Sequence, residues 1–134
     1  MTTVARGRRA VGEVVAGCRI PAVGLLTGFE NHAGRTTLPP ELTALGDVLH
    51  GVGNGDGRDG VLCGGVVGTY LHGPVLARNP ALADLLLSRA VGAELPPLAV
   101  ADQEAARNAH LAARRSRSWR RRLFRAGASG SAAI

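Results

Sequence analysis

The sequence predicts an α/β domain in which short β-strands are followed by C-terminal helices. Apolar runs bounded by glycine or proline fill the first 75 residues, and each has the length and β-branched content of a strand. From residue 79 the apolar residues recur at helical spacing instead. A chain of 134 residues makes one ordinary domain at most, and because aromatic residues are only 3% of it, Leu, Val and Ala must fill the core.

We expect five short strands before residue 75. Glycine-rich stretches separate them, and Gly64 and Gly65 can form a two-residue turn. Residues 61–63 and 66–71 are therefore expected to pair as a hairpin, whereas the glycine-rich segment 51–60 is expected to be a flexible hairpin loop. The five strands are placed in the runs AVGEVVAG, VGLLTGFENH, LGDVLHGVG, GVLCGG and VVGTYLHG.

A helix is expected over about 79–91. Asn79 is a favourable N-cap, Pro80 suits the first helical position, and Gly92 ends the apolar pattern. A second helix is expected to begin near Asp102, where the side chain can cap.

Charge and composition divide the chain into two parts. Residues 1–106 carry 8 Arg against 10 acidic residues, whereas residues 107–134 carry 8 Arg and no acidic residue. The net charge of +6 therefore belongs to the tail, and the body is nearly neutral. We expect a domain over residues 1–98, and over residues 99–134 a helix with a basic, partly disordered tail.

Composition argues against several classes of protein. No apolar run reaches the roughly 18 residues of a membrane span, Glu13 interrupts any signal-like segment, and two cysteines do not make a disulfide framework. A cytoplasmic location is expected. The segment 51–60 lacks the spacing of a calcium loop, so we expect no metal.

Nucleic-acid binding by the arginine-rich tail is an alternative function, but no nucleic-acid motif supports it. A solvated tail is favoured over one that contacts anionic lipid.

Two segments carry residues that could do chemistry. The first is GFENHAGRT, where Glu30 and His32 share one face of a strand, Asn31 points to the other, and Gly34 permits close approach of a ligand. The second is GTYLHGPVLARNP, where His72 ends a strand before a helix, a place where open α/β sheets bind ligands. The alternatives are a polar strand end with an ordinary turn and a structural histidine.

The two cysteines do not read as nucleophiles. A nucleophilic cysteine needs a helix after its turn, whose N-terminus lowers the thiol pKa. A β-branched strand follows Cys63, which is therefore expected to be a buried small hydrophobe at the hairpin. Cys18 lies in a predicted loop and is no better placed.

In this order and at this spacing, the two segments resemble the C-terminal half of cobyric-acid-synthase-like class I glutamine amidotransferases, which have a flavodoxin-like fold. The resemblance covers about residues 8–98 and is strongest to the glutaminase subunits of lipid II isoglutaminyl synthases. It implies hydrolysis of glutamine to supply ammonia for amidating the D-glutamate of the peptidoglycan stem peptide. It also implies a Mur-ligase-like synthetase as partner, which would hold the ATP and metal; no cofactor is expected in this chain. A cobyric-acid-type amidotransferase is the alternative within the resemblance.

The resemblance also implies roles for individual residues. His72 matches the catalytic histidine, which holds the cysteine as thiolate and protonates the departing ammonia. Asn31, His32 and Gly34 match the strand and turn that approach the glutamine's α-amino and α-carboxylate groups. Pro74 stands where many class I amidotransferases have a glutamate that orients the histidine. Glu30, which is expected with Asn31, His32 and Gly34 in the substrate-binding segment, is one candidate for that role. The family's nucleophilic cysteine has no counterpart here, and the chain is expected to be inactive alone.

Overall fold

The computed structural model describes residues 1–96 and 101–112, apart from the side chain of Arg6. The chain divides into two units, Met1–Leu98 and Ala99–Ile134. Within the second unit, residues 101–112 are helical, which confirms the expected start of a helix near Asp102. The expectation of a basic, partly disordered tail falls mostly on residues 113–134, which lie outside the described residues. No helix in the described part of the chain is long and apolar enough to cross a membrane.

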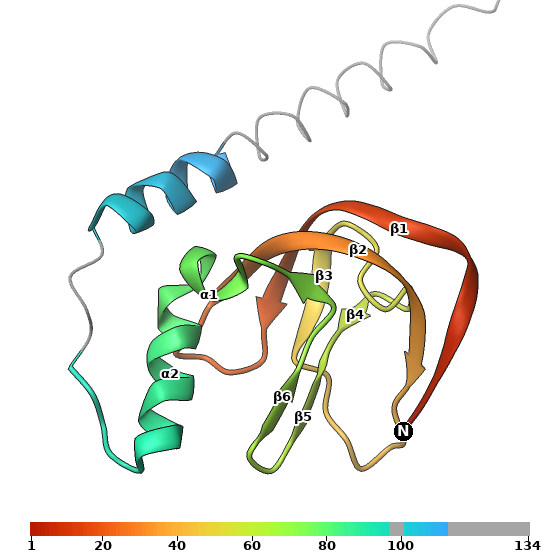
Figure 1. The fold of residues 1–134 in the computed structure, drawn as a ribbon, viewed down its shortest axis with the longest axis horizontal. Helices are drawn as coiled ribbons and strands as arrows, with labels where there is room; N and C mark the ends of the chain where they lie inside the picture. Colours follow the sequence, from red (N-terminus) through yellow and green to blue (C-terminus); the bar gives the residue numbers. More distant parts are fainter. Residues whose placement is uncertain (97–100, 113–134) are drawn as a thin grey trace, which may run out of the picture. The chain divides into compact units, whose positions relative to one another are not determined.

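The first unit is built on β-strands, with two helices after them (Figure 1). Two strands are much longer than the expected short runs, because β1 and β2 pair with each other along most of their length. The run VVGTYLHG, expected as one strand, forms two separate strands. In order the elements are β1 (Thr2–Cys18), β2 (Leu25–Thr37), β3 (Gly46–His50), β4 (Arg58–Asp59), β5 (Val61–Cys63), β6 (Val66–Gly68), β7 (Leu71–His72), α1 (Val75–Arg78) and α2 (Pro80–Val91).

The strands form two antiparallel sheets. The larger has the order β4-β3-β1-β2-β7, and the smaller is the hairpin of β5 and β6 around Gly64 and Gly65, as expected. The hairpin loop expected over residues 51–60 is shorter: residues 51–57 connect β3 to β4, and Arg58 and Asp59 form β4 itself. The α/β class with C-terminal helices is thus confirmed, but the parallel strand pairs of a flavodoxin-like sheet do not occur among the described residues, where every strand pair is antiparallel.

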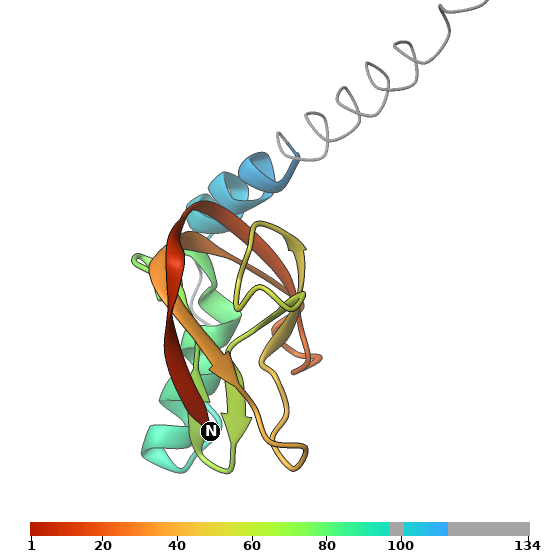
Figure 2. The same ribbon diagram turned by 90° about the vertical axis from the view of Figure 1, so that its right-hand side faces the viewer.

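The long β1–β2 ribbon is strongly twisted, as Figure 2 shows. Its register breaks once: Ala5 pairs with Gly34, but Ala10 pairs with His32, so β1 bulges between these positions. A bulge bends its strand and increases the local twist. The segment that bulges, residues 6–9, is RGRR.

The core lies between the carboxyl-terminal part of β1, the start of β2 and helix α2. Val14 and Leu26 are fully buried, and Leu82 brings the apolar side of α2 against them. Leu45 joins the same cluster from the segment before β3. Small and branched aliphatic residues fill this core, as the low aromatic content requires.

Two asparagine side chains complete the outer edge of β2, where β7 pairs only with Phe29 and Glu30. The Asn79 amide accepts from the Thr27 backbone N–H and donates to the Thr27 carbonyl, both at 2.8 Å. Asn54 makes the same pair of bonds with Thr36, at 2.6 and 2.7 Å. Asn79 is the N-cap residue of α2, as expected, but its side chain makes no capping hydrogen bond to the helix. An open strand edge leaves backbone groups unpaired, and these amides satisfy them.

The end of α2 is as expected. Gly92 follows the last helical residue with a φ of 69°, the left-handed conformation that glycine adopts most easily.

Candidate functional site

The site is built on a row of three paired residues that crosses the sheet. Glu13 of β1 pairs with Phe29 of β2, and Phe29 pairs with His72 of β7. Directly paired residues in a sheet present their side chains on the same side. These three therefore share one side of the sheet, which we call the His72 face.

His72 is exposed to solvent on this face. It is the last residue of the short edge strand β7, and helix α1 begins three residues later. Its position at the end of a strand and before a helix is the one expected from the sequence. An exposed imidazole is free to meet a reactant, since its ring is not enclosed by the rest of this chain.

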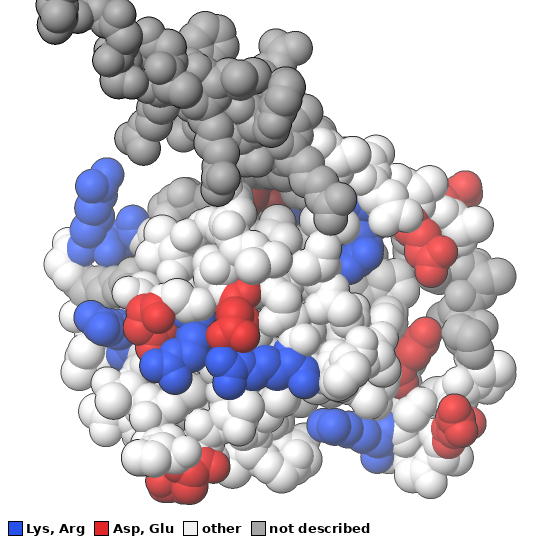
Figure 3. Space-filling model, turned by 180° about the vertical axis from the view of Figure 1, so that it is seen from behind, with Lys and Arg blue, Asp and Glu red and all other residues white. Residues whose placement is uncertain are grey.

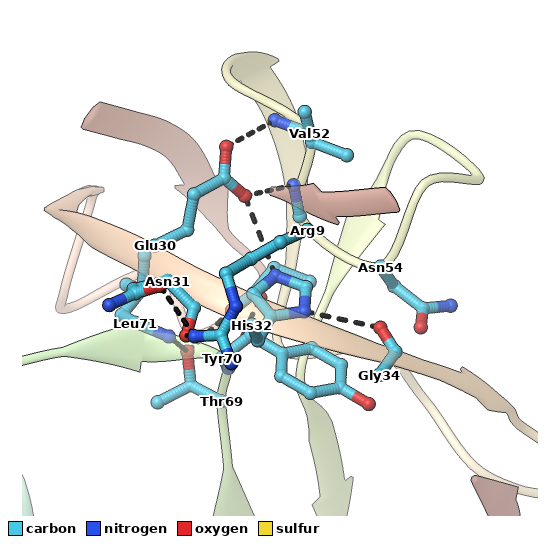
Figure 4. Close-up of polar contacts among 12 residues, drawn as sticks. Arg9, Glu30, Asn31, His32, Gly34, Val52, Asn54, Thr69, Tyr70 and Leu71 are labelled. Atoms are coloured by element: carbon cyan, nitrogen blue, oxygen red, sulfur yellow. Dashed lines mark hydrogen bonds and ion pairs between the residues drawn. The ribbon is translucent and has the colours of Figure 1, made fainter. Parts of the chain in front are cut away.

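Asn31 lies on the His72 face as well, two positions along β2 from Phe29. Its side-chain oxygen accepts a hydrogen bond of 2.7 Å from the Arg9 guanidinium, which comes from the bulge of β1. Figure 4 shows this contact. Bulges often re-aim a side chain beside a functional site. Here the bulge brings a cation to Asn31, and the sequence did not reveal this because the register of β1 was unknown.

Glu30, His32 and Gly34 project from the opposite side of β2, because side chains alternate along a strand. Glu30 pairs with Leu71, not with His72. We call this side the buried face, since Glu30 and His32 are only 2% and 8% exposed. The structure therefore does not support Glu30 as the group that orients His72 by direct contact.

The Glu30 carboxylate holds the loop that follows β3. Its two oxygens accept hydrogen bonds of 2.8 Å from the backbone N–H groups of Val52 and Gly53 (Figure 4). A buried carboxylate requires such partners, because leaving it without them would carry a large desolvation cost.

His32 is enclosed beside Glu30. Its ring stacks on Tyr70, with centroids 4.1 Å apart and planes 11° apart. Its Nδ1 donates to the Gly34 carbonyl oxygen at 3.1 Å, since that oxygen can only accept. Its Nε2 lies 3.6 Å from a Glu30 carboxylate oxygen (Figure 4). The geometry gives His32 a packing role in this chain.

Gly34 is required by the close approach of Tyr70. A Cβ atom placed on Gly34 would lie 2.9 Å from the Tyr70 hydroxyl oxygen, closer than real Cβ contacts. The sequence predicted that a ligand or a positive φ would explain this glycine, whereas here a side chain of the same domain fills the space.

Asp59 anchors the segment that leads to His72, and sequence reasoning missed it. Its carboxylate accepts a hydrogen bond of 2.5 Å from the Thr69 hydroxyl and one of 3.3 Å from the Tyr70 N–H. The Thr69 oxygen in turn accepts from the Leu71 N–H. Burial raises the pKa of the Asp59 carboxyl above its ordinary value, and the hydrogen bonds from Thr69 and Tyr70 oppose that rise.

Neither cysteine approaches the requirements of a nucleophile. Cys63 lies at the β5–β6 turn, as expected, but it is exposed and not buried. Cys18 ends β1 and receives a weak hydrogen bond of 3.4 Å from the Ile20 N–H. No helix follows either residue directly. Neither thiol sits at the turn between a strand and a helix that an activated cysteine needs.

Charges on the described surface are mixed in sign. Arg19 pairs with Asp47 at 2.7 Å, and Arg58 lies 3.6 Å from Asp56. Acidic and basic side chains alternate on the face seen in Figure 3. The described residues also contain no group of three or more side chains able to hold a metal.

Comparison with known proteins assigns the class. Residues 1–80, more than half of the chain, match the CobB/CobQ-like glutamine amidotransferase domain. The chain belongs to this family, which agrees with the expected resemblance.

Two curated relatives are the lipid II isoglutaminyl synthase (glutamine-hydrolyzing) subunits GatD of Staphylococcus aureus and Streptococcus pneumoniae. The first is 38% identical over 90 residues, which are 66% of this chain and 35% of the relative. The second is 46% identical over 66 residues, which are 48% of this chain and 25% of the relative. The chain therefore spans about a third or less of the length of each relative.

Proposed function

We propose that this chain is the histidine-bearing part of a glutaminase that supplies ammonia for amidating the stem-peptide glutamate of lipid II. The observation that carries the proposal is that His72 and Asn31 share one exposed face of the sheet. Both residues belong to the segment that matches the amidotransferase family. The relatives' names describe glutamine-hydrolysing subunits of a lipid II synthase, which supports this reaction over others in the family.

In the proposed reaction, a thiolate attacks the side-chain carbonyl carbon of glutamine and ammonia leaves; water then cleaves the resulting thioester, which releases glutamate and the thiol. His72 keeps the thiol deprotonated and then gives the proton to the leaving nitrogen. Asn31 binds the backbone end of the glutamine, and the neighbouring Arg9 guanidinium supplies a positive charge for its α-carboxylate. We assign Glu30, His32 and Gly34 to supporting this strand from the buried face.

The nucleophile is proposed to come from outside these 134 residues. Cys18 and Cys63 lack the required setting, and the His72 face carries Val11, which is 61% exposed and sits beside Asn31. A further protein layer over this face would bury Val11 and bring a cysteine to His72. We expect no glutaminase activity from the chain alone.

The ammonia is proposed to pass to a Mur-ligase-like synthetase that holds ATP and its metal, with no cofactor bound by this chain. A cytoplasmic location is part of the same proposal. A cobyric-acid-type acceptor is the second candidate, because the family match is to a CobB/CobQ-like domain.

Glutamine binding provides the first test. We would titrate L-glutamine into the isotope-labelled chain and follow the Asn31 and His72 resonances by NMR. D-glutamine, which has the same atoms in mirror-image arrangement, is the control ligand. Perturbations with L-glutamine that Asn31→Ala removes are expected. Perturbations that fall on the buried face, or that survive Asn31→Ala, would contradict the proposed glutamine site.

Three further observations address the nucleophile and the partner. An enzyme-coupled ammonia assay on the purified chain is expected to show no glutamine hydrolysis, and hydrolysis abolished by Cys63→Ala would reverse our assignment of that thiol. The DNA upstream of Met1 can be read for a strand, a glycine-rich turn and a cysteine. Co-purification with the Mur-ligase-like synthetase of the same genome would separate the lipid II acceptor from a cobyric-acid-type one.

A further inference from the structure

We propose that the ion pair between Glu13 and Arg78 is the device that positions His72. In many class I amidotransferases a glutamate two residues after the histidine orients it, but Pro74 occupies that place here. Glu30 cannot substitute for it by contact, because its side chain lies on the buried face and holds Val52 and Gly53. The carboxylate on the His72 face itself is that of Glu13.

Glu13 and His72 occupy the same row of the sheet, with Phe29 between them. Two strand spacings separate their backbones by about 10 Å. Glu13 is not aimed at the imidazole directly, because Arg78 binds both carboxylate oxygens, at 2.7 and 3.3 Å. The effect of Glu13 on His72 therefore passes through Arg78 and the chain that connects Arg78 to His72.

That connection is short. Arg78 is the last residue of α1, and only five residues separate it from His72. The segment is held at three places: His72 pairs with Phe29, Arg78 binds Glu13, and the adjacent Asn79 binds the Thr27 backbone and the Val75 carbonyl. Without the ion pair, the end of α1 would keep the Asn79 hydrogen bonds to β2 but lose the two hydrogen bonds from Arg78 to Glu13 of β1.

His72 needs such a tie because packing does not fix it. The imidazole is exposed, and β7 has only two residues. In contrast, the side chains of Glu13 and Arg78 are 21% and 29% exposed, so their pair is partly shielded from solvent. An ion pair that is shielded from solvent and makes two hydrogen bonds holds its geometry better than an exposed pair does. Solvent screens its attraction less, and the two hydrogen bonds from the guanidinium fix the orientation of the carboxylate.

The chain offers a matched control. Arg19 and Asp47 form a pair that also has two hydrogen bonds, at 2.7 and 3.2 Å, but these side chains are 40% and 56% exposed and the pair joins the residue after β1 to strand β3. Asp47→Asn removes a similar interaction without touching the segment from His72 to Arg78.

The test is NMR on the full chain. Glu13→Gln and Arg78→Lys are expected to shift the His72 ring and backbone resonances and to speed amide exchange in residues 71–78 about five- to tenfold. The exchanged pair, E13R with R78E, is expected to restore both. Arg78→Lys keeps the charge, so it remains informative if Glu13→Gln destabilises the whole domain.

Three outcomes would overturn the inference. His72 could be unchanged in the single variants, it could change no more than in Asp47→Asn, or the exchanged pair could fail to restore it. The inference rests on the proposed role of His72, but these readouts involve no glutamine. A failure of glutamine binding would therefore reject the proposed function and leave the positioning of His72 to be judged separately.

Discussion

The two sides of strand β2 use one short sequence for opposite purposes. On the His72 face, Asn31 is exposed and lies beside Arg9. On the buried face, Glu30 and His32 are enclosed, hydrogen-bonded and stacked. Neighbours in the sequence are thus separated by the thickness of the sheet. The comparison teaches that a polar motif on a strand supplies both the working surface and its support, in alternation.

The two faces should differ most in how much an alanine substitution lowers the free energy of unfolding, with Glu30→Ala on the buried face compared with Asn31→Ala on the His72 face. Removing the Glu30 carboxylate leaves the Val52 and Gly53 N–H groups without their acceptors, which should lower the free energy of unfolding by about 3 kcal/mol. Asn31→Ala should change it by less than about 0.5 kcal/mol. Urea unfolding measures both, and equal losses would mean that the two faces are not distinct.

Gly34→Ala should cost somewhat less, about 1–3 kcal/mol, because the added Cβ would press on the Tyr70 hydroxyl. Gly65→Ala is the matched control, since a Cβ there meets nothing within 4 Å. If thermal unfolding shows the same change for both, the close packing of Tyr70 against β2 does not constrain residue 34.

The pH dependence of stability should sharpen the description of the buried face. The folded-state pKa of Asp59 is raised above its ordinary value of 3.8. The stability that Asp59 contributes is therefore fully present below pH 3.8 and is lost as the pH rises through the folded-state pKa. We subtract the free energy of unfolding of Asp59→Asn from that of the native chain. This difference should be larger at low pH than at pH 7. Urea unfolding of both proteins from low pH to pH 7 measures the difference in their free energies of unfolding. A difference that grows with pH would contradict the raised pKa that we attribute to burial of the Asp59 carboxyl.

The smallest effect on stability is expected for His72→Ala. The exposed imidazole contributes little to packing, so the free energy of unfolding should change by less than about 0.5 kcal/mol. The same substitution should nonetheless alter the NMR response to L-glutamine. A large loss of stability would show that His72 is structural and belongs with the buried side of the comparison.

Much of the fold could be predicted from local pattern. The hairpin at Gly64 and Gly65, helix α2 and its glycine end follow from turn chemistry and helical spacing, which act over a few residues. The lengths of β1 and β2 could not be predicted, because pairing between them extends both strands past their apolar centres. The hydrogen bonds of the Asn79 side chain could not be predicted either: the side chain that suits a helix cap finds a buried strand edge 52 residues away.

The candidate site was predicted in part. His72 at the end of a strand and the alternation of Glu30 and Asn31 were visible in the sequence. Arg9, Glu13, Arg78 and Asp59 were not, because their relevance depends on which strands are neighbours and in which register. No short motif marks a residue whose partner is 65 positions away, as Arg78 is from Glu13.

By itself the sequence determined the α/β class through its hydrophobic periodicity, and the residues that could react through their types and positions; the two motifs that contain them carry the amidotransferase resemblance. Only the tertiary structure decided which of those residues work together. It set Glu30, His32 and Gly34 into the buried face and left Asn31 and His72 on the other. The physical reason is that strand alternation is local, whereas the choice of the buried side depends on Leu71, Tyr70 and the loop at Val52, which long-range pairing brings against β2.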